Sequence, residues 1–218
     1  MDPATPLTKN PVRFHPEDWA RLTYYSHKYK RRAFEVYSKR YLATSGQIYW
    51  SDSQLSAAYV DNYHEELDRK LGARVKATEM ITEIYVRRPE LAAFMDEARA
   101  LVRQHQANVI YGTIRLIEKD EESFLAWAKD RYVCVIFNLH MTHDPQGLET
   151  AADAFRALID LGIRHGGSYY LTYHRWASKT QVEACYPQLR EFLKLKLKYD
   201  PGELFQSNWY RHYRAMFA

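Results

Sequence analysis

From residue 78 onward, the chain switches between two hydrophobic periods, and the order of these switches restricts the possible folds more than any other feature. Side chains alternate between the two faces of a strand, whereas the buried stripe of a helix repeats every three to four residues. The predicted strands cover residues 80–86, 109–117, 132–140 and 168–174, and helical stripes run over residues 91–102 and 148–159. This order predicts an α+β fold, a ferredoxin-like β-α-β-β-α-β antiparallel sheet with both helices on one face.

The segments on either side of this unit are predicted to be mostly helical. A helix is expected to begin at Pro16, which is followed by two acidic residues, and to run to about Leu42. The predicted elements are an irregular lead-in and helical extension over residues 1–45, a short strand at 47–50, a helix over 55–71 and a last helix over 182–193 before a tail. No stretch rich in Ser or Gly divides the chain, so residues 46–218 are expected to form one domain.

The composition is that of a mildly basic, tyrosine-rich globular protein. The 218 residues carry a net charge of +4, too small to indicate nucleic acid, and 15% of them are aromatic, with 18 tyrosines. The basic run at residues 27–32 is predicted to be a solvated helix face. Cys134 and Cys185 do not suggest a disulfide framework, the N-terminus lacks a signal-peptide core, and no apolar stretch reaches roughly 20 residues. These features predict a cytoplasmic protein that binds neither nucleic acid nor membrane.

The predicted sheet has a second face that its two helices leave uncovered. The aliphatic side chains of each strand are expected to face the helices, which places a polar and aromatic set on the other side. This set indicates a ligand platform, because it combines rings and hydrogen-bonding groups with few charges. The structural alternative is that another subunit or the N-terminal helices cover it. The set comprises Glu83, Tyr85, Tyr111, Thr113, Arg115, Asn138, His140, Tyr170, Thr172 and His174.

Two other kinds of site are disfavoured by the pattern. His140 and His143 are close in sequence, but no carboxylate or Cys stands at a recognisable ligand spacing, so no metal site is predicted. The strand at residues 131–137 lacks the Gly and aromatic pattern of RNA-binding modules that share this element order. The second face is therefore expected to bind a small molecule.

Several motifs follow one another in a specific order. They are Thr82-Glu83-Ile84-Tyr85-Val86, Tyr111-Gly112-Thr113-Ile114-Arg115, His174-Arg175-Trp176, Tyr186-Pro187, and Asp200-Pro201 followed by Phe205, Ser207 and Asn208. In order and spacing, this set resembles the end of the vanillyl-alcohol-oxidase-type FAD-linked oxidases, a family that includes the aldonolactone and alditol oxidases. The resemblance runs from about residue 40 to the end of the chain.

The resemblance implies that the second face of the sheet lies over a flavin ring and holds the substrate against it. It implies that Arg115 stabilises negative charge. In an assembled enzyme, His140 or His174 would then be the candidate base for a substrate hydroxyl. Thr113 stands where relatives carry a Glu beside this Arg, which argues against aldonolactone and alditol chemistry. The further residues implied are Tyr111, Thr113, Asn138 and Tyr170 as substrate-binding groups, and Lys179 and Asn208 as groups that contact FAD.

In this family, an FAD-binding domain with Gly-rich loops precedes the substrate domain. The chain has 8 Gly and no Gly-rich loop after a strand, so that domain is expected to be absent. The sequence thus predicts the substrate-binding half of an FAD-dependent oxidoreductase that oxidises a C–OH or similar C–H group, active only with an FAD-binding domain or subunit. The alternatives are an inactive truncated domain that acts as an interaction module or homodimer, and a small-anion binder that uses Arg115 and His174.

Overall fold

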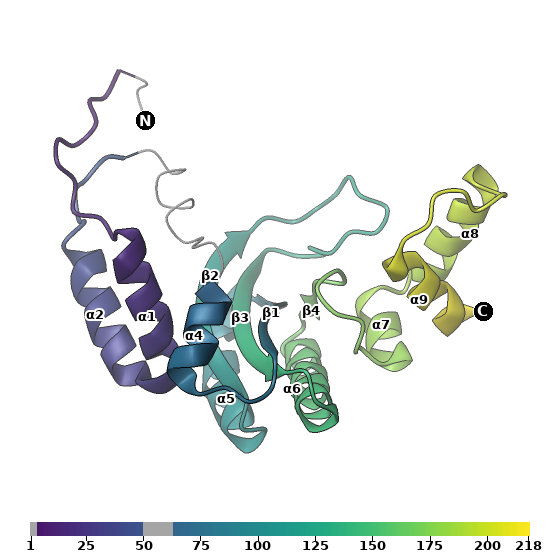
Figure 1. Cartoon of the computed structure of the whole chain (residues 1–218). Coiled ribbons are helices and arrows are strands. Elements are labelled where there is room, and N and C mark those ends of the chain that lie inside the picture. The colour runs from purple at the N-terminus through teal and green to yellow at the C-terminus, as the bar shows by residue number, and fades with distance from the viewer. Residues whose placement is uncertain (1–3, 50–62) are drawn as a thin grey trace. The chain divides into compact units, whose positions relative to one another are not determined.

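A computed structural model describes residues 4–49 and 63–218 of the chain, which divides into two compact units, Met1–Lys76 and Ala77–Ala218 (Figure 1). The sequence predicted that the helical extension ends at residue 45, whereas the first compact unit continues through Lys76. The predicted sheet and the helices that pack on it fall entirely within the second unit.

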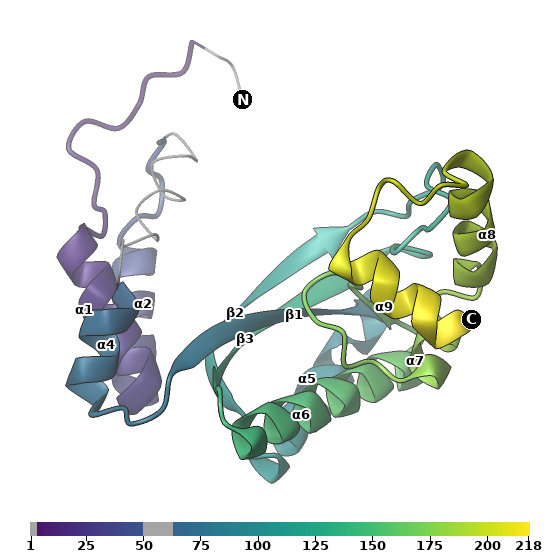
Figure 2. The ribbon, with the colours of Figure 1, turned by 45° about the vertical axis from the view of Figure 1, so that its right-hand side comes forward.

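The described part of the first unit has three helices, which lie side by side (Figure 1, Figure 2). They are α1 (Pro16–Lys28), α2 (Lys30–Leu42) and α4 (Tyr63–Leu71). The prediction of one continuous helix from Pro16 to about Leu42 is wrong, because Tyr29 leaves helical geometry with φ −136° and ψ 60°. This break lets α2 fold back along α1, so that Leu22 and Ala33 are both buried.

The first helix begins where it was predicted. The Asp18 carboxylate accepts a hydrogen bond from the His15 N–H at 3.1 Å, and its ion pair with Arg40 joins α1 to α2 at 3.1 Å. Residues 47–49 form no strand, while Trp50 and residues 55–62 of the predicted second helix lie outside the described residues. The rest of that helix is α4, and Gly72 follows it with φ 66°.

The second unit confirms the predicted ferredoxin-like sheet. Its strands are β1 (Ala77–Arg87), β2 (Asn108–Ile117), β3 (Tyr132–Thr142) and β4 (Ser168–Tyr169), and they pair antiparallel in the order β2-β3-β1-β4. A short 3-10 turn, η2 (Arg88–Glu90), leads from β1 into α5 (Leu91–Gln104), and α6 (Pro145–Arg164) connects β3 to β4. Figure 2 shows both helices on the same side of the sheet.

The core lies between the sheet and these two helices. Ile84 and Val135 from the central strands pack against Phe94 of α5 and Phe155 of α6, and all four are almost completely buried. At the edge of the core, the His165 ring contacts the carboxylates of Glu90 and Glu97 at 3.1 and 3.0 Å. His165 directly follows α6, so these contacts tie the end of α6 to η2 and to the middle of α5.

The C-terminal part of the second unit differs from the prediction in three places. The fourth strand covers two residues instead of 168–174, because the chain turns after Tyr170 and buries Leu171 and His174. The predicted helix over 182–193 is two helices separated around Pro187, α7 (Lys179–Cys185) and α8 (Leu189–Tyr199). The predicted tail forms α9 (Asn208–Phe217), whose buried tyrosines join the main core.

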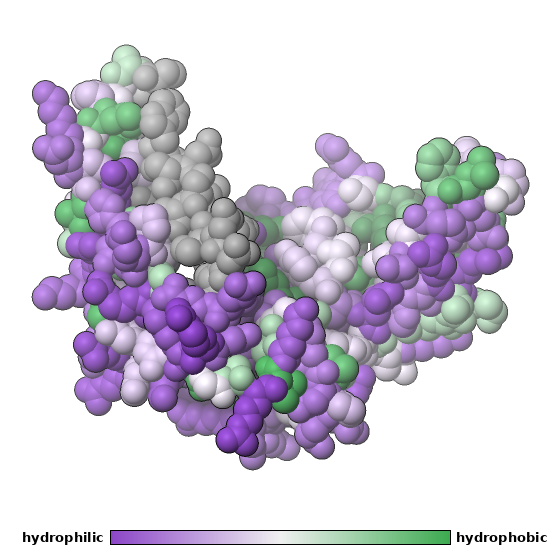
Figure 3. Space-filling model, in the orientation of Figure 1, coloured by the Kyte–Doolittle hydropathy of each residue, from purple (hydrophilic) through white to green (hydrophobic). Residues whose placement is uncertain are grey.

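Hydrophilic residues predominate on the surface seen in Figure 3, with smaller hydrophobic patches between them. Within residues 4–49 and 63–218, none of the helices combines the length and the apolar character needed to cross a bilayer.

Gly167 occupies a turn between α6 and β4 where two backbone segments approach closely. A Cβ atom at this position would lie 1.7 Å from the Tyr85 carbonyl oxygen and 3.0 Å from that of Gly162. We expect Gly167→Ala to lower the free energy of unfolding by about 3 kcal/mol, because backbone atoms would have to move. Urea unfolding followed by circular dichroism measures this loss. Gly202→Ala is the matched control, since its Cβ would meet only a Leu204 side-chain atom at 3.8 Å, and equal losses in both variants would contradict the explanation.

Candidate functional site

The register of the sheet arranges the face opposite α5 and α6 in rows of side chains, and four consecutive rows carry the candidate site residues. Directly paired residues of an antiparallel sheet point to the same face. The rows along β3 are Tyr85, Cys134 and Arg115; then Glu83, Ile136 and Thr113; then Ile81, Asn138 and Tyr111; and finally Glu79, His140 and Asn108. Successive rows are about 7 Å apart, the span of two strand residues. We call this side of the sheet the open face.

One residue of β2 interrupts the alternation. Val109 pairs with Leu139 and Tyr111 pairs with Asn138, which leaves Ile110 unpaired as a β-bulge. Simple alternation along the strand would place Val109 on the same face as Tyr111, but the extra residue reverses the alternation and Val109 lies on the helix side. For the same reason, Asn108 shares a row with His140.

A buried carboxylate lies at the centre of the open face. The Tyr85 hydroxyl donates to Glu83 Oε2 at 2.8 Å, and the Tyr173 hydroxyl donates to Glu83 Oε1 at 3.0 Å. The Cys134 thiol also donates to Oε2 at 3.5 Å. We call these four residues the carboxylate cluster. Three donors from β1, β3 and the segment after β4 converge on one side chain, which compensates for its burial.

The donors of the carboxylate cluster keep their protons at neutral pH. Burial, together with the hydrogen bond to Glu83, raises the pKa of Tyr173 to about 12. Burial and the charge of Glu83 also raise the pKa of Tyr85. The same two causes raise the pKa of the Cys134 thiol, against a smaller opposing effect of Arg115. The cluster is therefore a set of neutral donors around one carboxylate, and Cys134 is not an activated thiolate.

The loop at residues 118–131 covers one end of the open face. Its Trp127 ring lies 5.1 Å from the ring of Tyr85 and 6.2 Å from that of Tyr170, and its Ala128 is completely buried. Tyr170 in turn meets Tyr173 edge-on at 5.5 Å. These aromatic side chains form a wall beside the carboxylate cluster. The role of Trp127 was not predicted from the sequence.

Arg115 and Asn138 are two polar groups on the open face that have unused hydrogen-bonding capacity. The Arg115 side chain is exposed and forms no ion pair with any described residue. Asn138 is only 6% exposed, and no described residue donates a hydrogen bond to its Oδ1. A buried oxygen without a donor is costly, so this atom is suited to accept a hydrogen bond from a ligand.

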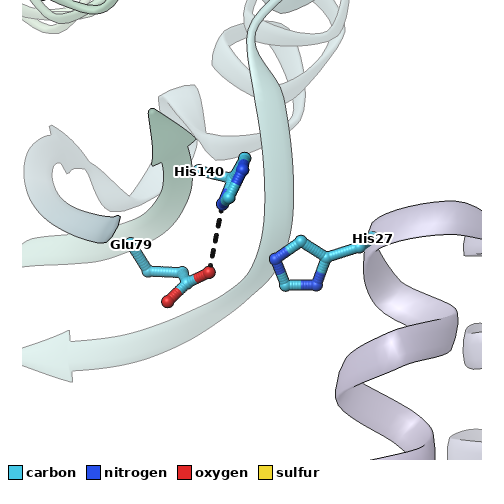
Figure 4. Close-up of side chains that lie close together, drawn as sticks. All are labelled: His27, Glu79 and His140. Atoms are coloured by element: carbon cyan, nitrogen blue, oxygen red, sulfur yellow. Dashed lines mark hydrogen bonds and ion pairs between the residues drawn. The ribbon is translucent and has the colours of Figure 1, made fainter. Parts of the chain in front are cut away.

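His140 lies at the opposite end of the open face from Arg115. Its Nδ1 lies 3.2 Å from Glu79 Oε1, and Figure 4 shows the ring and the carboxylate joined by this contact. The rows of His140 and Arg115 are separated by six residues of β3, about 20 Å. The two side chains therefore cannot contact the same atom of a small substrate. Glu79 was missed because the predicted strand began one residue later.

The prediction that His174 lies on the open face is wrong. Its ring packs on the helix side of the sheet, 4.4 Å from the Phe155 ring and 3.4 Å from Thr82 Oγ1. Burial lowers the pKa of His174 to about 4, so the ring is neutral at physiological pH. The physical reason is the short β4: once the strand ends, the alternation that was extrapolated to residue 174 no longer applies.

The early end of β4 also changes the positions of Thr172 and Tyr173, the two residues before His174. Thr172 was predicted on the open face but is an exposed turn residue outside the rows. Tyr173 was predicted on the helix side, yet its hydroxyl reaches Glu83 and 40% of the residue is exposed. Tyr170 lies beside the Glu83 row, as predicted, and its N–H donates to the Glu83 carbonyl at 3.1 Å.

The two residues implied to contact FAD lie away from the open face. Lys179 is the first residue of α7, and its Nζ lies 5.3 Å from the centre of the Phe217 ring. Asn208 is the first residue of α9 and accepts a hydrogen bond from Arg211 at 2.6 Å. Neither residue is in the open-face rows, since both lie in the helices after β4, α7 to α9, which we call the C-terminal helical layer.

No protein-family model matches this chain, and no curated protein is similar enough to it to be identified as a relative. The functional roles of the open-face residues thus depend on their chemistry and on the resemblance in their motifs.

The low pKa of His174 generates a prediction about stability. Because the folded pKa of about 4 lies below the value of about 6.5 for an unfolded histidine, the unfolded chain binds a proton more readily between these pH values. The contribution of neutral His174 to the free energy of unfolding should have its full value above pH 6.5. The free energy of unfolding should then fall by about 3 kcal/mol as the pH decreases to 4. His174→Phe should remove this part of the pH dependence, as measured by urea unfolding at both pH values. His143→Phe, at an exposed position, should retain it, and an unchanged slope in His174→Phe would contradict the assignment.

Proposed function

We propose that residues 77–218 form the substrate-binding domain of a vanillyl-alcohol-oxidase-type FAD-linked oxidoreductase that oxidises a C–OH or similar C–H group. The observation that carries the proposal is the carboxylate cluster on a sheet face that also presents an exposed cation, Arg115. Exposed tyrosines beside a fixed carboxylate offer both an aromatic surface and hydrogen-bond acceptors to a hydroxylated ligand. The motif resemblance then supplies the class of reaction.

The chemistry of the open face fits a flavin at two points. Arg115 would face the negative charge of a reduced flavin, and the Asn138 oxygen would accept a hydrogen bond from a flavin or substrate N–H or O–H group. Lys179 and Asn208 do not fit, since they lie in the C-terminal helical layer. A bound FAD would supply the hydride acceptor, while the protein orients the substrate.

The residues of the proposed site divide into two groups with different tasks. Around Arg115, the Glu83 carboxylate still has lone pairs free to accept a substrate hydroxyl, and Tyr111, Thr113 and Tyr170 would limit its orientation. At the other end, His140 would act as a base on a substrate long enough to span the rows, with Glu79 holding its ring. His174 has no role in the proposed reaction, because its side chain is buried on the helix side of the sheet.

We also propose that the enzyme works in a reducing compartment such as the cytoplasm. Cys134 and Cys185 are both free and buried. Free thiols are usual in cytoplasmic proteins, whereas secreted proteins more often pair them.

The proposal predicts flavin-dependent activity only in the presence of an FAD-binding domain. The chain should be mixed with the FAD-loaded flavin-binding domain of a vanillyl-alcohol-oxidase-type enzyme, and visible spectra should be recorded with a panel of alcohols. We expect a complex that carries flavin absorbance and is bleached anaerobically by at least one alcohol. Arg115→Gln should slow this bleaching about a hundredfold, because a charge-stabilising group is lost.

The matched control is Arg103→Gln, which removes an exposed arginine from the last turn of α5, on the other side of the sheet. It should leave the bleaching rate unchanged. If the chain neither binds the flavin domain nor changes its spectrum with any alcohol, the oxidoreductase proposal fails. A folded chain that then binds only small ligands or itself would support the interaction-module alternative.

A further inference from the structure

The outer edge of β2 is a long strand edge that no described strand covers. β2 is the first strand of the order β2-β3-β1-β4, so only its inner edge is paired, with β3. Residues 111–117 follow the bulge and form a regular ladder with β3. Alternate residues of an edge strand point their backbone N–H and C=O away from the sheet and offer them to a further strand, which makes such edges sites of strand addition.

The side chains along this edge do not oppose strand addition. Natural edge strands are commonly protected by Lys, by Pro or by inward-pointing charges. Residues 111–117 contain no Lys, Pro or acidic residue, and Arg115 is their one charged side chain. Ile114 and Leu116 point to the helix side of the sheet, where they pair with Val135 and Val133, yet they are 53% and 71% exposed. The edge therefore combines unpaired backbone with uncovered apolar side chains.

A second copy of the same strand fits this edge in one register. If two β2 strands pair antiparallel about Thr113, Arg115 of each copy lies opposite Tyr111 of the other. This brings a cation to an aromatic ring twice and places no two charges opposite each other. The same register sets Ile114 opposite Gly112 and brings Leu116 close to Ile110, so the exposed apolar side chains are covered. A register centred on Arg115 would instead oppose two cations.

We propose that this chain forms a two-fold symmetric dimer by pairing β2 with β2 of a second copy, centred on Thr113. The four strands of each copy would then form one continuous sheet, and a two-fold axis perpendicular to the sheet would keep both open faces on the same side. This interface does not depend on a flavin or on the proposed reaction. In this dimer, the rows that contain Arg115 in the two copies lie next to each other at the interface.

Sedimentation of the full chain over a range of concentrations tests the interface. We expect a reversible, concentration-dependent dimer for the natural sequence and a monomer for the double variant Ile114→Lys with Leu116→Lys, which places four like charges at the seam. Leu204→Lys is the matched control, since Leu204 is an equally large apolar residue that is 83% exposed in another part of the unit. It should remain dimeric. A natural sequence that is monomeric at every concentration, or a dimer that Leu204→Lys alone dissociates, overturns the proposal.

Disulfide trapping tests the register independently and does not rely on destabilising variants. Thr113→Cys places two thiols opposite each other on the two-fold axis, whereas Leu116→Cys separates them by several residues along the strands. Both native cysteines are buried and should stay unreactive. Under mild oxidation, we expect Thr113→Cys to form covalent dimers much faster than Leu116→Cys, with circular dichroism showing that both variants are folded. Equal rates, or faster trapping of Leu116→Cys, would exclude this register.

Discussion

The antiparallel pairing of β1 with β3 determines both layers of the second unit. All 11 residues of β1 have a partner in β3. The register that directs Ile84 and Val135 into the core also directs Glu83 and Ile136 to the open face. A slip of one residue would exchange the two sets and place a carboxylate against α6. The hydrophobic packing of the core thus fixes the polar site on the opposite side.

Burial of Glu83 is tolerated because the donors around it come from different parts of the fold. Tyr85 is on the same strand, Cys134 on the neighbouring one, and Tyr173 on the turn after β4. Burial raises the pKa of all three donors, so none of them ionises at neutral pH and Glu83 is surrounded by neutral donors. A buried carboxylate held by neutral donors is rigid but keeps free lone pairs, which suits the positioning of a hydroxyl group better than the transfer of its proton.

The sequence predicted most of the sheet and much of the open face, since both follow from alternation within strands. The failures occur where tertiary contacts end an element. No local signal marks the end of β4 at Tyr169. The chain turns after Tyr170 because Leu171 and His174 pack on the helix side, which buries His174, leaves Thr172 in an exposed turn and brings Tyr173 to Glu83. The bulge at Ile110 was not predicted, because a bulged residue is of the same amino-acid types as its neighbours in the strand.

The helical parts were predicted less well for a related reason. Tyr29 carries no Gly or Pro signal, yet it separates α1 from α2, because folding back buries more apolar surface than one continuous helix. The aromatic segment of α9 was read as a tail, although Tyr210 and Tyr213 stand three residues apart and are both buried. The three-residue spacing of these two tyrosines was the sequence signal that could have predicted helix α9.

The bulge at Ile110 has a consequence for how this protein can change over evolutionary time. A single insertion or deletion within β2 would reverse which of its side chains reach the open face, and every row from Asn108 to Arg115 would change together. The loop at residues 118–131 forms no ladder, although Leu125, Trp127 and Ala128 pack against the buried clusters. Descendants of this sequence are thus free to vary the loop in length and to acquire new ligand preferences there, while the length of β2 stays constant.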